Sequence, residues 1–479
     1  MNLKAQLAAK DLEIAQLKLE IAQLKKLIYG FKSERFKPQL TPTEQGNLFA
    51  DPIEQEPVAE ITEKITYERK KGSSHKGRNE LPAHLPVREV IIEPEEDTTN
   101  MTKIGEEISE TLEYQAASLV RVITIRPKYA KPQGEGIVIA LPPIRPFDKS
   151  IAEASLVSHI IVSKFVDHLP FYRQIQIFRR EFRWEPSKST VNDWFIAVCT
   201  LLRPLYEFMI ERLLESYYIQ ADESPMPVQD RNKNGSTHKG QQWVYHSPKE
   251  GIVIFHYHRT RSAQAPREFL SNYNGWVQCD GHKAYDKLEK KLPSIKLVGC
   301  WVHARRKYFE SIDNDKKRSE FALQIFSEVY KCESVCKEYT PADRKIYREK
   351  NVKPLFEKLK SWIKEEGIKV LPKSKIGKAM SYTLSQWPKL IRCLEDGQLE
   401  LDNNLIENKI RPLALGRKNY LFAGNHKAAQ RIAMMYSFFA TCKIHDVNPR
   451  DWLTSTLEKI KDTKMSDLDQ LMPQNFKGV

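Results

Sequence analysis

The stretch that decides the fold reads Tyr217-Tyr218-Ile219-Gln220-Ala221-Asp222-Glu223-Ser224-Pro225, an aromatic and apolar run that ends in two acids. Two further apolar runs follow it, at residues 242–245 and 251–257. A fourth run, residues 275–279, ends in Asp280-Gly281, and a fifth, residues 295–301, precedes His303. Short apolar runs that end in polar or turn-forming residues are typical of β-strands.

Three strands in a meander, followed by strands that alternate with helices, predict a mixed α/β sheet of the ribonuclease H-like class, which we assign to residues 216–435. Asp222 and Asp280 are expected where their strands end, so that both carboxylates project into a crevice beside the sheet edge. Such hard oxygen ligands suit Mg²⁺ or Mn²⁺. Two ions about 3.5 to 4 Å apart would activate the attacking oxygen and stabilise the leaving oxygen of a phosphoryl displacement.

A third carboxylate usually completes such a site, and Glu407 is the candidate. Asp402 or Asn403 can cap a helix that begins there, which places Glu407 just after its first turn. A single acid of this kind is more often an ordinary surface carboxylate than a metal ligand. The positions of the three acids relative to one another must decide between these two roles. The basic residues that we expect around this acidic centre, an arrangement natural where metals and phosphates meet, are Lys409, Arg411, Arg417 and Lys418.

The composition favours a nucleic acid partner. The chain has 479 residues, which suggests about three domains, and a formal net charge of +14. A basic excess of this size favours a polyanion, with nucleic acid ahead of a membrane surface. The hydrophobic fraction of 41% and the charged fraction of 29% exclude a chain that is disordered throughout.

Cysteine usage and hydropathy indicate a soluble, cytoplasmic protein. The seven cysteines are odd in number and thinly spread, so we expect reduced thiols and no disulfides. Charged residues interrupt the N-terminal apolar positions, which excludes a signal peptide core, and no apolar run approaches the roughly 20 residues that span a bilayer.

Residues 1–36 carry a heptad pattern, with isoleucine and leucine three and four residues apart. This pattern predicts a parallel coiled coil that makes a homodimer or a higher oligomer, although an amphipathic helix packed on its own domain gives a similar pattern. Residues 37–80 are an acidic, proline-containing linker followed by a basic arm, in which Lys76 and Arg78 are predicted to contact DNA. A solvated linker is the alternative for this arm.

Residues 81–143 predict a small β-rich module, from β-branched runs at residues 90–92 and 119–125. Residues 144–215 read as helices, with a short break followed by a helix that opens on a serine or threonine cap, as in a helix-turn-helix. A plain helical hairpin has the same spacing. The residues predicted to contact DNA in this region are Arg173, Arg179, Arg180, Lys188, Thr190 and Asn192.

The chain resembles the DDE transposases of the insertion-sequence-66 family (TnpC-type), from the predicted coil almost to the end. The motifs that carry the resemblance are Lys32-Ser33-Glu34-Arg35, residues 81–86, residues 167–174, Ala221-Asp222-Glu223-Ser224, Asp280-Gly281 with Tyr285, residues 299–307, Asp402-Asn403-Asn404 with Glu407, and residues 416–424. The last four together are very specific.

The resemblance implies that Asp222, Asp280 and Glu407 are the catalytic triad and hold two Mg²⁺ or Mn²⁺ ions. It also implies a helical insertion at about residues 312–395, a C-terminal helical segment at residues 436–479, and small accessory proteins as partners. The residues that it implies line the DNA-facing side of the site are His303, Arg305, Arg306 and Lys307.

One feature departs from the family pattern. Family members typically carry paired cysteines for a zinc ribbon before the helix-turn-helix, whereas residues 97–102 and 129–134 contain no cysteine here. A Cys₄ site cannot form without thiolates, so we predict no structural zinc. Cys332 and Cys336 lack a second pair at finger spacing, and we assign them to helix packing.

The residues and the resemblance together predict a bacterial, nucleoid-associated transposase that binds double-stranded DNA at the ends of its mobile element, cleaves one strand and joins it to target DNA. One alternative is a metal-dependent nuclease that cleaves without joining. The other is a catalytically weakened DNA-binding regulator, which the missing cysteines keep open.

Overall fold

The computed structural model describes residues 119–123, 125, 128–130, 137–139, 145–147, 150–230 and 236–478. All of them belong to one compact unit, Ala116–Val479. The predicted coiled coil at residues 1–36, the linker and basic arm with Lys76 and Arg78, and the β-branched run at residues 90–92 lie outside the described residues.

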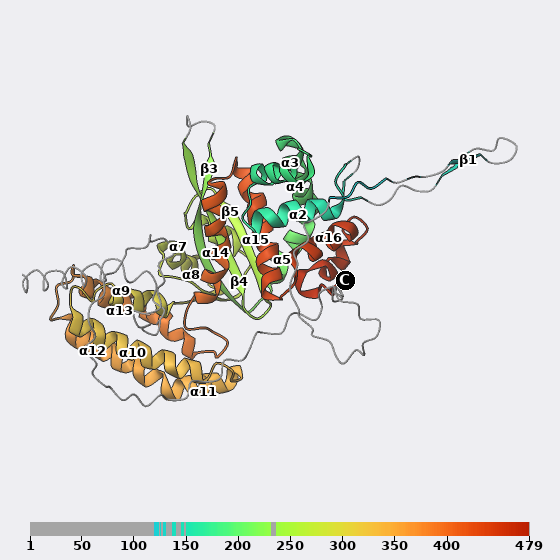
Figure 1. The fold of residues 1–479 in the computed structure, drawn as a ribbon. Helices are drawn as coiled ribbons and strands as arrows, with labels where there is room; N and C mark the ends of the chain where they lie inside the picture. Colours follow the sequence, from blue (N-terminus) through green and yellow to red (C-terminus); the bar gives the residue numbers. More distant parts are fainter. Residues whose placement is uncertain are drawn as a thin grey trace, which may run out of the picture. The chain divides into compact units, whose positions relative to one another are not determined.

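A five-stranded mixed sheet forms the centre of the unit (Figure 1). Its strands are β3 (Tyr218–Gln229), β4 (Thr237–Ser247), β5 (Ile252–His258), β6 (Gly275–Gln278) and β7 (Ile295–Val298), in the spatial order β5-β4-β3-β6-β7. Strand β4 is antiparallel to β3 and β5, whereas β3, β6 and β7 run parallel. The predicted mixed α/β class is confirmed.

Helices cover the sheet and close its outer edge. The helices after the sheet strands that pack on it are α14 (Asn404–Tyr420) and α15 (His426–Ile444). Strand β5 is an edge strand, and the hydroxyls of Ser437 and Thr441 on α15 accept hydrogen bonds from the N–H groups of Phe255 (2.8 Å) and Val253 (3.2 Å). These bonds satisfy donors that an exposed sheet edge would leave unpaired.

The helices that precede the sheet within the described part of the chain are α2 (Ala154–Phe165), α3 (Phe171–Phe182), α4 (Lys188–Leu201) and α5 (Arg203–Leu214). Helix α3 ends at Arg183, whose backbone is left-handed with φ 53°. Helix α4 begins after Ser187, whose hydroxyl accepts a hydrogen bond from Thr190 N (3.0 Å). A serine cap at the start of the second helix was predicted from the sequence, and it is present.

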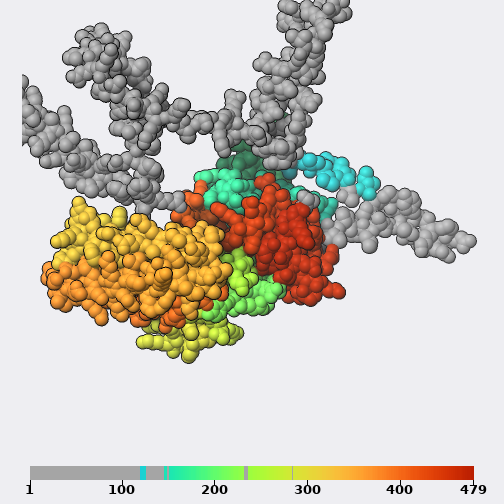
Figure 2. All heavy atoms as spheres, turned by 90° about the horizontal axis from the view of Figure 1, so that it is seen from below, coloured from blue at the N-terminus to red at the C-terminus, as the bar shows by residue number. Residues whose placement is uncertain are grey.

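A separate group of helices lies between β7 and α14, and its yellow-to-orange atoms gather in one lobe in Figure 2. Its members are α9 (Trp301–Phe309), α10 (Lys316–Val335), α11 (Pro341–Asn351), α12 (Lys353–Gly367), α13 (Lys375–Leu390) and the 3₁₀ helix η3 (Ile391–Leu394). They share a core in which Trp301 stacks on Phe356 at 4.2 Å and meets Trp387 edge-on. Trp301, and Trp243 of the sheet, are both buried.

The remaining elements are two short helices, α7 (Lys283–Asp286) and α8 (Leu288–Lys291), the short α6 (Gln264–Phe269), and a C-terminal group of α16 (Pro449–Lys459), η4 (Met465–Leu471) and η5 (Pro473–Asn475). No helix among the described residues is long and apolar enough to cross a membrane. All seven cysteines are free thiols, and Cys332 packs against the core of the helical group.

Two strand predictions differ from the structure. The described residues of the run 119–125 are exposed and form no strand, while a two-stranded sheet forms from β1 (Lys128–Ala130) and β2 (Ile137–Ile139). β-Branched residues favour strands only where a partner strand is available. Strand β3 does not end at Asp222 but continues to Gln229, because β4 pairs with it along this whole length.

Candidate active site

The register of two parallel strands brings Asp222 and Asp280 to matching positions. The last pair between β3 and β6 joins Gln220 to Gln278, and each acid lies two residues beyond its glutamine. Side chains two residues apart along a strand share a face of the sheet. Although β3 continues past Asp222, β6 has already ended, so the two acids stand beside the place where the sheet loses one strand.

The environment of Asp222 opposes its ionisation. Burial raises the pKa of the Asp222 carboxyl well above its ordinary value, and the nearby charges of Glu223, Asp280 and Glu407 raise it further. The N–H of Glu223, which donates a hydrogen bond to Asp222 Oδ1 (2.7 Å), acts in the opposite direction. The other two predicted acids therefore lie close enough for their charges to act on Asp222.

A buried polar network lies beneath the two acids. Tyr218 OH and Gln220 Nε2 (3.0 Å) both donate to Gln278 Oε1. Gln278 Nε2 donates to the carbonyl of Glu400 (2.7 Å), and Gln220 Nε2 donates to the carbonyl of Asp402 (3.1 Å). The sheet thus holds the segment that leads into α14.

Helix α14 presents Glu407 to this site. As predicted, the helix begins beside Asp402 and Asn403: Asp402 Oδ1 accepts a hydrogen bond from Asn404 N (2.9 Å). Asn403 instead turns its amide to the sheet, where Nδ2 donates to the carbonyl of Ala221 (3.0 Å), the residue before Asp222. Glu407 lies in the first turn, and its Oε1 is 3.9 Å from His303 Nε2 on α9.

The three predicted acids are neighbours but do not form a ready-made metal cage. Among the described residues, no group of three or more His, Cys, Asp or Glu side chains has the geometry of a metal site. The charges of Asp280 and Glu407 act on Asp222. A metal ion shared by the three carboxylates would nevertheless require their side chains to come closer together.

Four further residues lie around the acids: Glu223 and Tyr285, which the sequence offered only as parts of motifs and without a role, and Arg261 and Tyr382. Glu223 is buried and binds Arg261 through Oε1, with Arg261 Nε at 2.9 Å, and Tyr285 OH lies 3.4 Å from Glu223 Oε2. The charges of Asp280 and Asp222 act on Arg261, which is half exposed. The hydroxyl of Tyr382 on α13 hydrogen-bonds to the backbone of Gly281. Arg261 and Tyr382 belong to no motif, and only the folded structure reveals them.

The basic residues predicted near the acids come from two helices. His303, Arg305, Arg306 and Lys307 are all half-buried on α9, while Arg411, Arg417 and Lys418 lie on α14. Arg417 Nη1 donates to the carbonyl of Pro225, three residues beyond Asp222 on β3. Helix α14 therefore borders the strand that carries Asp222, and α9 approaches α14 where His303 faces Glu407.

The predicted helix-turn-helix residues are distributed over α3 and α4. The side chains of Arg179 and Arg180 are exposed, with glutamates 3.6 Å and 2.9 Å away at Glu185 and Glu181. Lys188 and Asn192 are exposed on α4, and Thr190 is half-buried beside the cap. Exposed Arg173 on α3 donates to Asn419 Oδ1 on α14 (3.3 Å), which links the two parts.

Comparison with known proteins identifies the family. The profile described as "Transposase IS66 family" matches residues 149–431, which include all three acids. The chain belongs to the IS66 transposase family. Profiles described as "IS66 C-terminal element" and "Transposase C of IS166 homeodomain" match residues 437–474 and 16–90.

Two relatives from Sinorhizobium fredii (strain NBRC 101917 / NGR234) are similar over most of their length. The one named Uncharacterized protein y4qI is 32% identical over 99% of this chain and 91% of its own length. Uncharacterized protein y4jD is 31% identical over 100% of this chain and 99% of its own length.

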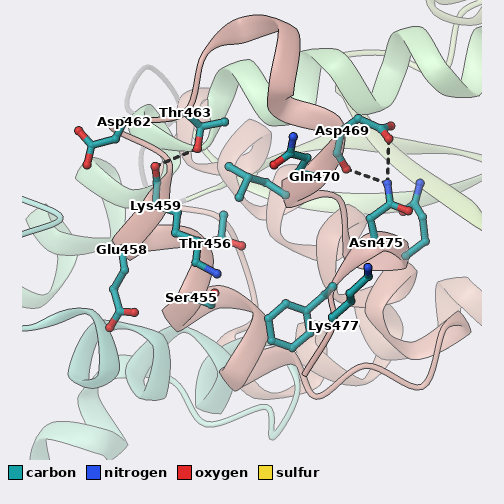
Figure 3. A pocket seen from close by; sticks show the side chains of 13 residues that line it. Ser455, Thr456, Glu458, Lys459, Asp462, Thr463, Asp469, Gln470, Asn475 and Lys477 are labelled. Carbon is teal, nitrogen blue, oxygen red and sulfur yellow. Dashed lines mark hydrogen bonds between the residues drawn. The ribbon is translucent and has the colours of Figure 1, made fainter. Parts of the chain in front are cut away.

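The IS66 C-terminal element contains a pocket of about 900 Å³ (Figure 3). It is lined by side chains of α16 and of the two 3₁₀ helices, and none of the three acids lines it. Asn475 Nδ2 donates to Asp469 Oδ2 (3.0 Å) across its rim, and Thr463 OH donates to the carbonyl of Lys459 (2.9 Å). The pocket is separate from the acids of the IS66 domain.

Proposed function

We propose that this IS66-family protein binds the ends of its mobile element and catalyses metal-dependent DNA cleavage and strand transfer at Asp222, Asp280 and Glu407. The observation that carries the proposal is the matched placement of Asp222 and Asp280 on adjacent parallel strands, with the charge of Glu407 acting on Asp222. Three carboxylates brought together from distant parts of the chain repel one another and do not stabilise the fold. A site for metal-dependent phosphoryl transfer, in contrast, requires such a cluster of carboxylates.

The sheet supports a ribonuclease H-like assignment for residues 216–435. Three strands form an antiparallel meander, and two further strands add in parallel to the side of the first. The helical group from Lys316 to Leu394 corresponds to the proposed insertion at about residues 312–395. In this assignment, the acids lie on the first strand, just after the fourth strand, and on the helix that follows the insertion.

The donor set fits Mg²⁺ or Mn²⁺. Three carboxylates provide hard oxygen ligands. Burial raises the pKa of Asp222 most, the charges of Glu223, Asp280 and Glu407 raise it further, and a divalent cation would relieve this repulsion. When bound, two such ions would supply charge neutralisation at the attacking and leaving oxygens. The protein's own part is to hold the carboxylates in place through the Glu223 N–H, the Gln220–Gln278 network and the start of α14.

Double-stranded DNA, both element ends and target, is the proposed partner. Helices α3 and α4 would recognise the ends as a helix-turn-helix in which Lys188 and Asn192 approach the major groove. The profile match that covers residues 16–90 carries the word homeodomain, which supports a DNA-binding role for that part of the chain. Self-association through residues 1–36 and help from small accessory proteins complete the proposal.

The test is incubation of purified protein with element-end DNA, a target plasmid and Mg²⁺, followed by sequencing of the products. The proposal predicts nicks at the element ends and joined products in the wild type. An Asp222→Asn variant should bind the ends but yield neither product. Nicks without joined products would favour the nuclease, and binding without nicks would favour the regulator.

A further inference from the structure

We propose that α13 of the helical insertion and the neighbouring α9 together carry a DNA-binding strip, made of Lys307 on α9 and Tyr382, Lys378 and Lys375 on α13, which holds phosphates of the DNA strand that runs outward from the acids. The inference rests on the proposed function, because it names a surface for the same substrate. It assigns a role to helices that sequence analysis left without one.

The strip starts next to Asp280. The Tyr382 hydroxyl hydrogen-bonds to the backbone of Gly281, the residue after Asp280, and the charge of Asp280 acts on it. The approach is close, since a Cβ atom added to Gly281 would lie 2.6 Å from Tyr382 Oη. Helix α13 of the insertion therefore borders the acid site directly.

A second contact joins the strip to Glu407. The Lys307 ammonium lies 4.7 Å from the centre of the Tyr382 ring. Lys307 is one helical turn after His303 on α9, and His303 Nε2 is 3.9 Å from Glu407 Oε1. Helices α9 and α13 pack side by side (Figure 1), so their facing residues form one continuous surface.

Helix α13 extends this surface away from the acids. Lys378 lies one turn before Tyr382, and Lys375 follows on the same face at helical spacing. Both lysines are exposed, while Ile376, Ala379 and Met380 on the same helix are buried in the core of the insertion. The face that carries the lysines is therefore the solvent face of the helix.

The charge of the strip suits phosphates. Residues 312–395 contain 19 Lys and Arg against 12 Asp and Glu, an excess of 7 out of +14 for the whole chain. Within the described part of the chain, neither Lys375 nor Lys378 makes an ion pair, whereas Lys353 and Lys369 of the same insertion pair with glutamates. Cations without carboxylate partners remain available to an external anion.

The length of the strip matches a short run of nucleotides. Seven residues of α-helix between Lys375 and Tyr382 span about 10 Å, at a rise of about 1.5 Å per residue. Phosphates along one strand advance about 3.4 Å per nucleotide, so about three phosphates lie within reach. These would be the nucleotides next to the scissile phosphate on the side of α13.

The test compares two charge-matched double variants in an Asp222→Asn background, which prevents cleavage during binding. One carries Lys375→Gln and Lys378→Gln on the strip. The control carries Lys353→Gln and Lys369→Gln, which remove the same charge from the same insertion at positions away from the strip. Affinity for element-end DNA is measured by fluorescence anisotropy across a salt series, with a hydroxyl-radical footprint at the lowest salt.

The strip variant should lower the slope of log affinity against log salt by about 2, since each lost phosphate contact lowers it by about 0.9. It should also lose protection over about three nucleotides beside the cleavage position, while the control matches the parent. Equal slopes and footprints in the two variants would overturn the strip. Normal binding in a wild type that never cleaves would overturn only the proposed catalysis, and a parent that binds no DNA would overturn both.

Discussion

Replacement of Gln278 by methionine should separate the positioning of Glu407 from simple loss of stability. Gln278 is fully buried, and its amide contacts Tyr218, Gln220 and the carbonyls of Gly299 and Glu400. Methionine has a similar volume but offers none of these strong hydrogen bonds. The substitution therefore breaks the tie between β6 and the segment that leads into α14.

The structure gives the magnitude of the effect. Tyr218 OH and the carbonyls of Gly299 and Glu400 each lose a buried partner, at about 1 kcal/mol each, so unfolding should become easier by about 3 kcal/mol. For the unit Ala116–Val479, an unfolding entropy of about 2.1 cal/mol/K per residue converts this loss to a fall of about 4 °C in the melting temperature. A displacement of Glu407 by about 1 Å would lower the cleavage rate by about 100-fold.

The assay is single-turnover cleavage of element-end DNA at a temperature well below both melting points. The control is Val277→Ala on the same strand, a buried position that should cost about 2 to 3 kcal/mol without touching the network. The Gln278 variant should lose cleavage while the Val277 variant retains it to within a few-fold. Equal losses of stability with equal cleavage in the two variants would refute the positioning role.

Three further predictions concern stability. Burial and neighbouring acids raise the pKa of Asp222, so its ionised form destabilises the fold at neutral pH. Asp222→Asn should therefore raise the melting temperature at pH 7 by a few degrees, and added Mg²⁺ should not raise the melting temperature of this variant further. A variant with a lower melting temperature than the wild type would contradict this prediction. Arg348 is fully buried and bonded to Glu333 and to backbone carbonyls, so Arg348→Met should lower the free energy of unfolding by about 3 to 5 kcal/mol, measured by urea unfolding. A loss below about 1 kcal/mol would show that the network is dispensable. Burial lowers the pKa of Lys164 to about 8. Between about pH 8 and 10.5 the unfolded state therefore binds more protons than the folded state, and the free energy of unfolding should rise with pH. Lys164→Met should abolish this rise in thermal melts.

The sequence predicted the strands of the sheet because each is a local apolar run. The predicted runs at residues 242–245, 251–257 and 275–279 correspond to β4, β5 and β6. The prediction that β3 ends at Asp222 was wrong, because the length of this strand depends on its pairing with β4. Past Gln220 the strand is an edge on the side of β6, so Pro225 and Pro227 fit within it, and β4 pairs with it as far as Gln229.

The candidate acids were accessible to sequence reasoning for a different reason. Asp280 follows a strand, and Glu407 follows a recognisable helix start, so both stand beside local signals. That the three acids act on one another depends on contacts such as the bond from Gln220 to Asp402, which lie 182 residues apart. No local pattern encodes that distance, and the roles given to the acids remain a proposal.

Residues supplied by loops and by the insertion escaped prediction entirely. Arg261 lies between β5 and α6, and Tyr382 lies inside an ordinary amphipathic helix. Only packing reveals that Arg261 meets Glu223 and that Tyr382 meets Gly281. Their positions follow from tertiary contacts, which periodicity and composition do not carry.

The most direct test of the account is the anomalous scattering of Mn²⁺ in crystals of the protein bound to element-end DNA. The account predicts manganese peaks about 2.0 to 2.3 Å from carboxylate oxygens of Asp222 and Asp280, with Glu407 completing the coordination. Manganese bound elsewhere, or Glu407 left outside the coordination sphere while DNA occupies the site, would contradict it.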